Sequence, residues 1–486
     1  MRFAMPLANW WLNMWLQKGT EMDDLRELRY PWLNAVQFLT GGYPAEIGAL
    51  HLVIGWLFVL VLVTRVLSER QLPFEFRCAT LYFALTLFTN PAFNFVGLNL
   101  NEVFGVIGVT KMIARGRIPS PYNSGTVVVG LYGLFAVSMV HVLITLLVYP
   151  ALNSDLGSAF TKIAINIKIA VLALNLAIVG VSLRRGQGLE LLLRSCVNVA
   201  TAGLLLYLLQ VFIMAAGTMP YGTYLDAGFV GVPSFGSVSI ERGHFGKFMA
   251  PYFPFMLFAL LKWRCRWQFG LMCLITMINF SASSQVFFLC FCVMALLRFR
   301  RHMGLRAVML IGVACVGAAA LIVSYWDVFA GIGEKIYALA IEGDESEGGG
   351  RSFGVFYDYI SSYPLGLGYS GSTLRTAPGL PEINASYFAF FAQFSFLAPG
   401  VLAAYLYAVW RAIRRARLGH GDLFGCLSLG VAMSVVIFFT DILWFVPLIW
   451  LPFELIHSLR RHERSQRETQ TATTDLQNSS RLGAGT

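Results

Sequence analysis

Long apolar segments, separated by short clusters of arginine and lysine, recur along almost the whole chain. Only 13% of the residues are charged and 57% are hydrophobic, whereas soluble domains have about 25% charged and about 45–50% apolar residues. A chain with so few charges cannot cover a globule with polar surface. The sequence therefore predicts a polytopic membrane protein and excludes a soluble multidomain enzyme.

The apolar segments have the length of transmembrane helices, each of which needs about 20 residues. Short segments of alternating hydrophobicity, which a transmembrane barrel requires, are absent from the sequence. We expect an all-α fold with about twelve or thirteen transmembrane helices, the count depending on whether 96–113, which Asn99, Asn101 and Glu102 interrupt, crosses the membrane. The predicted spans are 47–66, 77–94, 96–113, 125–149, 159–183, 191–216, 245–261, 267–281, 284–298, 305–325, 386–410, 422–440 and 443–459.

Basic clusters fall on every second connection between these spans and contain 24 of the 36 lysines and arginines. Cytoplasmic loops concentrate Lys and Arg, so this side of the membrane is predicted to be cytoplasmic. The same distribution explains the net charge of +10 without nucleic acid as a partner. The clusters are Arg65, Arg70 and Arg77; Lys111, Arg115 and Arg117; Arg184, Arg185 and Arg194; Lys262, Arg264 and Arg266; Arg298, Arg300, Arg301 and Arg306; Arg411, Arg414, Arg415 and Arg417; and Arg460, Arg461, Arg464 and Arg467.

This topology divides the chain into segments of different character. The predicted outer loop of roughly 60 residues far exceeds the usual helix connection of about two to eight residues. The polar C-terminal end is rich in Thr, Ser and Gln, a composition typical of disorder. In chain order we expect an interfacial N-terminal segment at 1–46, transmembrane helices over 47–325 with a short outer loop at 217–244, a long outer loop at 326–385, transmembrane helices over 386–459 and a disordered cytoplasmic tail at 460–486.

The first candidate site is Glu241-Arg242-Gly243-His244, where a predicted span begins, with Lys247 one turn further on. A helix start offers free N–H groups and the positive end of the helix dipole. An arginine there can bind phosphate in a bidentate manner. The alternative is that Arg242 and Lys247 only extend to the lipid headgroups.

The second candidate site begins at Arg351 in the long outer loop. The aromatic and apolar residues that follow recur at helical spacing, which predicts an amphipathic helix at 351–362 on the outer surface. A glycine-rich turn comes next, in which Gly366 and Gly368 would let the backbone approach a ligand and form an anion-binding nest.

The third candidate site opens the span at 386–410 and contains Glu382, Asn384 and Tyr387. Glu382 could act as an acid or base at the membrane surface. The alternative is that Asn384 or the neighbouring Ser386 only caps the helix.

Ionisable residues inside predicted spans form a separate group of candidates. A charge at bilayer depth costs several kcal/mol and faces a cavity or a partner. Lys162, in the outer half of its span, would together with Arg242 attract a diphosphate. We interpret His141, in an apolar segment, as a hydrogen-bonded core residue.

Taken in order, these motifs resemble the O-antigen polymerase/ligase superfamily. The resemblance rests on Arg351 followed by an aromatic helix, then Pro364-Leu-Gly-Leu-Gly, Asn384-Ala-Ser-Tyr-Phe and Phe394-Ser-Phe-Leu-Ala-Pro-Gly400. The external Arg242 and the segment Asn279-Phe-Ser-Ala-Ser-Ser-Gln285 also match the family pattern.

The resemblance implies a helical fold of the C-type glycosyltransferase kind in the bacterial inner membrane, with the active site facing the periplasm. The substrates would be oligosaccharides linked to undecaprenyl diphosphate. Arg242 and Arg351 would hold the diphosphate and stabilise the leaving group, without a metal or cofactor, while an acceptor hydroxyl attacks the anomeric carbon with inversion. Further substrate contacts are expected from Lys162, Lys247, Gly366, Gly368, Asn384 and Tyr387.

One position departs from the family pattern, because Ile383 stands where the ligases carry a histidine. This difference favours a polymerase and leaves the general base open among His244, Glu382 and Glu241. We therefore expect a polymerase of O-antigen, capsule or exopolysaccharide repeat units, working in the lipid bilayer beside a flippase and a chain-length regulator. The alternatives are an O-antigen ligase and a lipid-linked oligosaccharide flippase or transporter, which would show broken helices and internal repeats.

The alternation of basic clusters predicts the topology directly. A reporter fused after Gly349 should be active outside the cytoplasm, and one fused after Arg415 should be active inside it. A cytoplasmic signal at Gly349 would contradict the placement of all three candidate sites on the outer side.

Overall fold

The computed structural model of the protein describes most of the helical segments expected from the sequence. The described residues are 49–94, 98–116, 125–149, 156–215, 220, 235–239, 242–279, 282–299, 353–368, 386–419, 421–440 and 446–483. Within these residues the chain is helical and contains no β-strand. The predicted span at 305–325 lies outside them.

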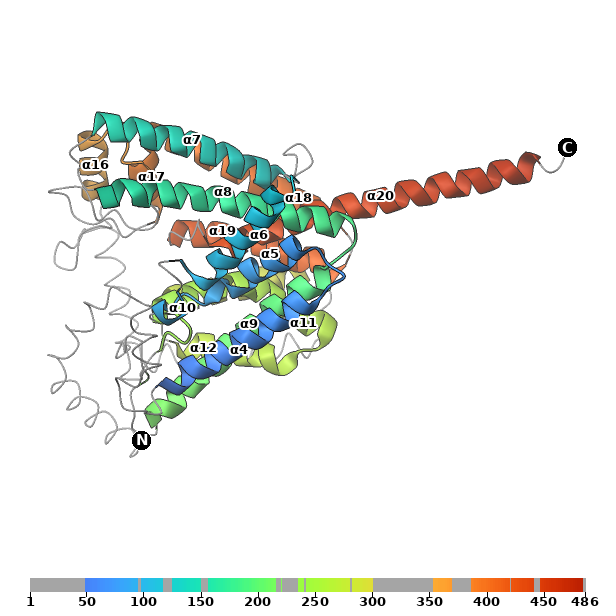
Figure 1. Ribbon diagram of the computed structural model, residues 1–486, viewed down its shortest axis with the longest axis horizontal. Helices are drawn as coiled ribbons and strands as arrows, with labels where there is room; N and C mark the ends of the chain where they lie inside the picture. Colours follow the sequence, from blue (N-terminus) through green and yellow to red (C-terminus); the bar gives the residue numbers. More distant parts are fainter. Residues whose placement is uncertain are drawn as a thin grey trace.

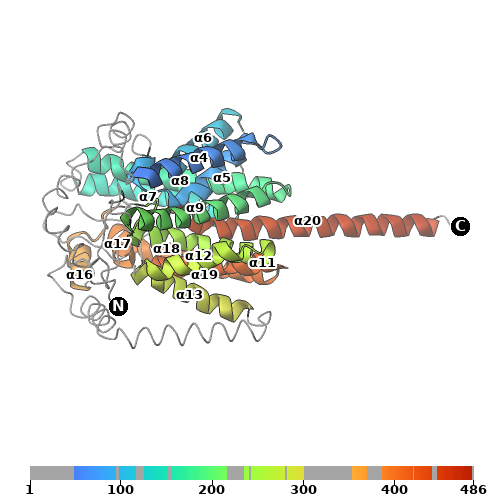
Figure 2. The same cartoon turned by 90° about the horizontal axis from the view of Figure 1, so that it is seen from below.

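The helices pack side by side into a bundle, from which the last one projects (Figures 1 and 2). They are α4 (Leu50–Ser68), α5 (Phe74–Ala84), α6 (Leu100–Ala114), α7 (Thr126–Val148), α8 (Leu156–Arg184), α9 (Leu189–Ala215), α10 (Arg242–Met249), α11 (Phe253–Trp263), α12 (Arg266–Ile278), α13 (Ala282–Phe299), α16 (Phe353–Ser362), α17 (Ser386–Phe394), α18 (Ala398–Arg417), α19 (Asp422–Thr440) and α20 (Pro447–Gly483).

Among the residues that the structure describes, five helical stretches are long and apolar enough to cross a membrane. This result confirms the α-helical membrane-protein class, while the total of twelve or thirteen spans stays a prediction. The five stretches are Leu50–Ser68, Thr126–Val148, Lys162–Arg184, Leu189–Ile213 and Phe390–Arg417.

Two of the predicted continuous spans are broken helices in the structure. A third, at 77–94, is α-helical only to Ala84, where the 3-10 turn Leu85–Leu87 follows. The span at 245–261 divides at a 3-10 turn that contains Pro251, a residue without a backbone N–H to continue the helix. The span at 386–410 divides at Ser395, whose φ of 44° lies in the left-handed region. Hydropathy does not reveal such breaks, because the turns are as apolar as the helices that they separate.

The C-terminal end also differs from the expectation of a disordered tail. The structure continues α20 without interruption to Gly483, and its second half extends away from the bundle (Figures 1 and 2). Side-chain pairs at helical spacing support this part, including Arg460–Glu463 at 2.7 Å and Gln466–His462 at 3.0 Å. Composition indicated disorder because the segment has no apolar face, but it contains no helix-breaking proline after Pro452.

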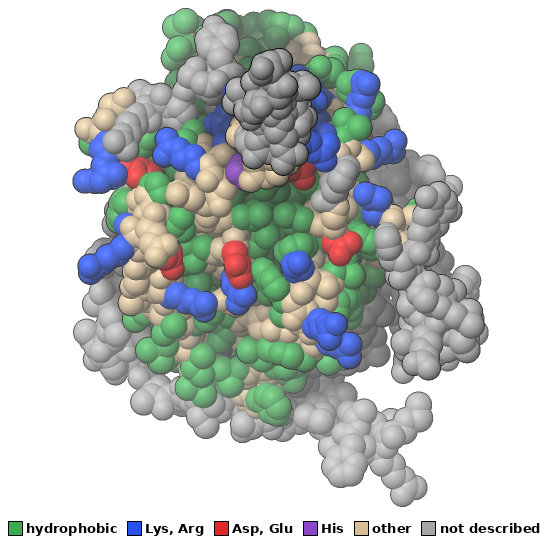
Figure 3. Space-filling model, turned by 90° about the vertical axis from the view of Figure 1, so that its right-hand side faces the viewer, with side chains coloured by type: hydrophobic (Ala, Val, Ile, Leu, Met, Phe, Trp, Pro, Cys, Tyr) green, Lys and Arg blue, Asp and Glu red, His purple; other side chains and the backbone are tan. Residues whose placement is uncertain are grey.

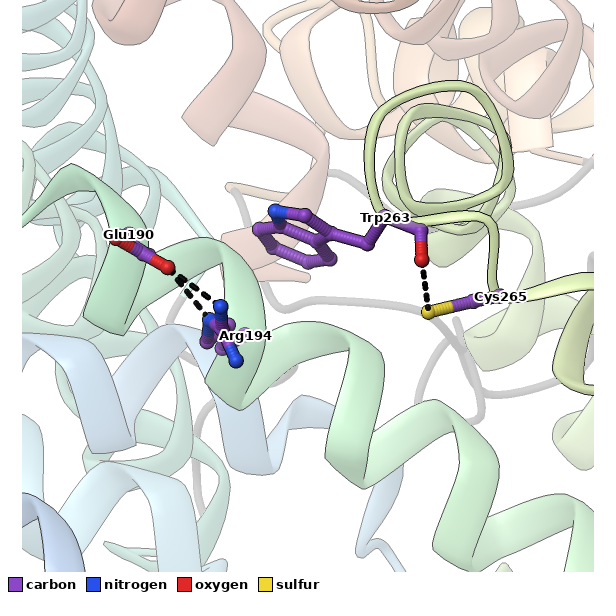
Figure 4. A network of polar contacts seen from close by, with 4 residues as sticks. All are labelled: Glu190, Arg194, Trp263 and Cys265. Carbon is purple, nitrogen blue, oxygen red and sulfur yellow. Dashed lines mark hydrogen bonds and ion pairs between the residues drawn. The ribbon is translucent and has the colours of Figure 1, made fainter.

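Lys and Arg side chains gather on the face from which α20 projects (Figure 3), which we call the basic end. Contacts between helix ends hold this face together. The guanidinium of Arg194, at the start of α9, lies 5.1 Å from the ring centroid of Trp263, at the end of α11 (Figure 4). Arg415 of α18 donates to His457 Nδ1 of α20 at 2.7 Å. The basic connections predicted to share one side of the membrane thus meet at one end of the bundle.

A fully buried carboxylate, Glu454 of α20, lies just inside the basic end. Its Oε1 accepts a hydrogen bond from Ser458 Oγ at 2.8 Å. Gly125, the N-cap residue of α7, and Gly180 of α8 make room for it, since a β-carbon on either glycine would overlap with the carboxylate. The junction of α7, α8 and α20 therefore depends on glycine at both positions.

Gly180→Ala is expected to destabilise the protein by about 1–3 kcal/mol, because the added methyl group overpacks this junction. Gly130→Ala on α7 is the matched control and should be neutral or stabilising, since a β-carbon there has no neighbour within 4 Å and alanine favours helix. Thermal unfolding of the purified protein measures both.

The destabilisation caused by Gly180→Ala should be smaller in a Glu454→Ala background, because that background lacks the carboxylate with which the added methyl group overlaps. An equal cost of Gly180→Ala in both backgrounds would contradict the described packing.

Candidate functional site

The candidate site lies around the non-helical segment 364–368, which we call the glycine loop. It follows α16 and packs between α7 and α17, at the end of the bundle away from the projecting half of α20 (Figures 1 and 2). The helix predicted at 351–362 is confirmed as α16.

One face of α7 holds the glycine loop. The Nε2 of His141 lies 2.6 Å from the carbonyl oxygen of Leu365, and because a carbonyl only accepts, the imidazole donates. Tyr149 Oη accepts a hydrogen bond from the N–H of Leu365 at 3.3 Å. Thr145 lies between these two along the helix and faces Gly368, where a β-carbon would come within 2.8 Å of its hydroxyl oxygen. Residues spaced by four share one helix face, so α7 presents a polar stripe to the loop.

The helix α17 holds the loop from the other side through backbone contacts. The N–H of Leu367 donates to the carbonyl of Ala392, and that of Gly368 donates to the carbonyl of Gln393, both at 3.1 Å. Ser395, at the break that follows α17, donates its hydroxyl to the carbonyl of Pro364. The loop therefore joins α7 to the broken helix α17–α18.

These contacts correct the expected role of the two glycines. The N–H of Gly366 donates to Tyr363 at 2.7 Å, so every N–H from residue 365 to residue 368 already has an acceptor within the protein. The interpretation as an anion-binding nest is therefore wrong for this arrangement. Both glycines have positive φ (80° and 77°), and a β-carbon on Gly366 would lie 2.5 Å from the carbonyl oxygen of Gln393. Glycine is required here for conformation and close packing.

A buried polar layer connects α7 to α8 next to this loop. Lys162 of α8 is only 3% exposed. Asn166, one turn further on, donates to the carbonyl of Lys162 at 2.8 Å and accepts a hydrogen bond from the hydroxyl of Ser138. Ser138 precedes His141 by about one turn of α7, which brings a buried cation close to the loop anchor.

Two other ionisable residues inside predicted spans, Lys168 and Glu102, are partly exposed and have a structural role. Lys168 forms an ion pair with Glu102 at 2.8 Å. Glu102 also accepts from the N–H of Asn99 at 3.1 Å in a capping box that starts α6. These residues connect α6 to α8 and leave Lys162 as the buried cation of interest.

The first predicted site is correctly placed at a helix start, because α10 begins at Arg242. His244 and Lys247 are both partly buried. The ring of His244 lies 6.3 Å from that of Phe248 on the same helix. Gly246 fits closely against Ser284 of α13, which fixes α10 on the bundle.

The remaining predicted site residues cannot be joined to these contacts. Arg351, Glu382 and Asn384 lie outside the described residues, and the side chains of Arg242 and Tyr387 are likewise not described. Their roles stay predictions.

Sequence reasoning missed Thr145, Tyr149 and Gln393 as neighbours of the glycine loop, whereas the interpretation of His141 as hydrogen-bonded is confirmed. A signal was present, since His141, Thr145 and Tyr149 recur every four residues along a mostly apolar segment. Their partners could not be found, because more than 200 residues of chain separate them from the loop.

Comparison of the chain with protein-family models, curated proteins and solved structures finds no match. Among the described residues, no group of three or more His, Cys, Asp or Glu side chains could hold a metal ion.

His141→Phe is expected to loosen the glycine loop, because it leaves the carbonyl of Leu365 without its donor. A buried unsatisfied carbonyl costs about 1–3 kcal/mol, so the amides of Leu367 and Gly368 should exchange with deuterium about tenfold faster or more. Hydrogen–deuterium exchange measured on the purified protein tests this expectation.

The matched control is His462→Phe, which removes an equivalent bond, 2.9 Å from His462 Nδ1 to the carbonyl of Arg184, at the basic end. It should leave exchange in the glycine loop unchanged. Equal acceleration in both variants would show that His141 does not anchor the loop specifically.

Proposed function

We propose that this protein is a polysaccharide polymerase of the bacterial inner membrane. It joins oligosaccharide repeat units carried on undecaprenyl diphosphate, at the periplasmic face, by metal-independent inverting glycosyl transfer. A C-type glycosyltransferase arrangement with twelve or thirteen spans forms part of this proposal, as does the resemblance to the O-antigen polymerase/ligase superfamily.

The observation that carries the proposal is the fastening of α16 to α17 by the glycine loop. Arg351 stands two residues before the first residue of α16, and Asn384 stands two residues before that of α17. Contacts of residues 364–368 with Ala392, Gln393 and Ser395 hold these two helices together. These contacts lie at the C-terminal ends of α16 and α17, and the segments that carry Arg351, Glu382 and Asn384 precede the other ends of the same two fastened helices.

Helix starts favour a negatively charged ligand. The N-terminal end of a helix carries a partial positive charge and free N–H groups. Predicted site residues stand two positions before α16 and α17, and Arg242 begins α10. In the proposed reaction, the acceptor hydroxyl oxygen forms a bond to the anomeric carbon, the bond to the diphosphate oxygen breaks, and a base takes the hydroxyl proton.

The N–H groups of the glycine loop are already hydrogen-bonded, which increases the importance of the arginines for binding phosphate. Since residues 365–368 have no N–H left for a phosphate, the charge that develops on the diphosphate is stabilised by side chains together with the helix starts. Arg242, Arg351 and the buried Lys162 are the candidates, and an arginine fork matches phosphate geometry better than a lysine does. The base stays open among His244, Glu382 and Glu241.

A transporter or flippase of lipid-linked oligosaccharide is the second candidate, and one observation favours it. The two broken helices, α10–α11 and α17–α18, are a feature that secondary transporters use at their substrate sites. The functional test must therefore separate transfer of glycosyl units from their movement across the membrane.

Deletion of the gene is expected to shorten the surface polymer to single repeat units, because the flippase that delivers them is a separate protein. Gel analysis of surface glycan together with a lipid extract measures this. A ligase mutant would instead accumulate long lipid-linked chains, and a transporter mutant would retain single units inside the cell. Either result would reject the polymerase.

Complementation of the deletion then tests the arginine. Arg351→Ala should lower polymer formation by about a hundredfold or more, as does the loss of one donor to a developing oxyanion. Arg351→Lys should fail nearly as severely, because it keeps the charge but loses the planar fork. Arg375→Ala, in the same predicted loop, is the matched control and should complement fully.

A further inference from the structure

Three helices enclose an open groove at the basic end, away from the candidate site. The groove lies between α13, α18 and α19 and has a volume of about 460 Å³. This is within the range of about 300–1,000 Å³ that is typical of small-molecule sites. Residues that line it are Met294, Leu297, Arg298, Ile413, Arg417 and Leu429.

The body of the groove suits hydrocarbon. Apart from the two arginines, Ser428 is the polar side chain among the lining residues, and its hydroxyl already donates to the carbonyl of Gly425 at 2.7 Å. Leu297 is 64% exposed although it lies in a helix of the bundle. An apolar groove in a membrane protein faces lipid chains, so hydrocarbon can enter it from the bilayer.

The groove is cationic where the helices end. Arg298 is the penultimate residue of α13, and Arg417 is the last residue of α18. Neither arginine forms an ion pair with an acidic residue in the part of the chain that the structure describes. Two guanidinium groups beside one groove are matched by a phosphate, to which arginine donates paired hydrogen bonds.

An arginine near the end of a helix also interacts favourably with the helix dipole, but this effect does not explain the groove. Arg414 occupies the same last turn of α18, and its guanidinium lies over the ring of Trp410 on its own helix, 5.4 Å from the centroid. It does not line the groove. The placement of Arg298 and Arg417 on two different helices around one apolar groove is therefore the distinguishing feature.

We propose that this groove is a binding site for an anionic phospholipid, with an acyl chain along α13 and α19 and the headgroup phosphate on Arg298 and Arg417. The lipid comes from the leaflet at the basic end, where basic pockets between transmembrane helices bind anionic headgroups. This site does not depend on the proposed polymerase activity.

The test uses the purified full-length protein in neutral detergent. Phosphatidylglycerol, which is anionic, should raise the Tm at lower concentration than phosphatidylcholine, which is zwitterionic with the same acyl chains. Arg298→Ala combined with Arg417→Ala should raise the half-effective phosphatidylglycerol concentration by about tenfold or more. Arg414→Ala, the matched control, should leave it unchanged.

Two further variants control for misfolding of the alanine pair and test the groove itself. Arg298→Lys with Arg417→Lys keeps the charge and should weaken the response less than the alanine pair does. Ala432→Phe places a ring in the groove, which Ala432 also lines, and should abolish the preference for phosphatidylglycerol while both arginines remain.

Several results would overturn the proposal. One is an equal rise in Tm with phosphatidylglycerol and with phosphatidylcholine. Another is an equal change of the half-effective phosphatidylglycerol concentration in the alanine pair and in Arg414→Ala. Either result indicates only general attraction of lipid to the protein surface. If soluble glycerophosphoglycerol, which has no acyl chains, raises the Tm as much as intact phosphatidylglycerol does, the acyl chain does not occupy the groove. If Ala432→Phe lowers the Tm without lipid and phosphatidylglycerol has no effect on the unchanged protein, a segment of the chain itself fills the groove.

Discussion

The glycine loop depends on hydrogen bonds that satisfy its irregular backbone. Non-helical chain within a membrane protein persists only where its polar groups find partners other than lipid. Here His141 and Tyr149 contact the carbonyl and the N–H of one residue, Leu365. The N–H of Gly366 donates to the carbonyl of Tyr363, and α17 provides acceptors for the N–H groups of Leu367 and Gly368. Removal of these partners would leave buried backbone groups unsatisfied and would detach α16 from α17.

The two ends of the bundle are held by different chemistry. At the basic end, long charged side chains connect helix ends across the surface, and the buried Glu454 fits between glycines of other helices. At the opposite end, backbone N–H groups of the glycine loop donate to backbone carbonyls of α17. Long side chains keep neighbouring helices together but do not fix a backbone position closely. Backbone hydrogen bonds fix the position of the backbone more closely, and a site that positions its substrates requires such fixed geometry.

The functional proposals occupy separate parts of the molecule. The proposed polymerase activity would rely on segments next to α10, α16 and α17, whereas the proposed lipid site uses the ends of α13 and α18. Each can fail without the other. If both hold, anionic lipid would stabilise the bundle from the face opposite to the reaction, and would not compete with the lipid-linked substrate.

The sequence by itself determined the helical membrane class, the meeting of basic connections at one end, and the helix starts at Arg242 and near Arg351. These features depend on local composition, periodicity and charge, which can be read from the sequence without knowledge of tertiary contacts. Tertiary structure alone decided the breaks at 250–252 and 395, the place of Glu454 and the role of Gly366. The sequence motif around Gly366 is equally compatible with an anion nest and with close packing. The carbonyl of Gln393, 27 residues further along the chain, decides for packing because it occupies the space that a β-carbon would need.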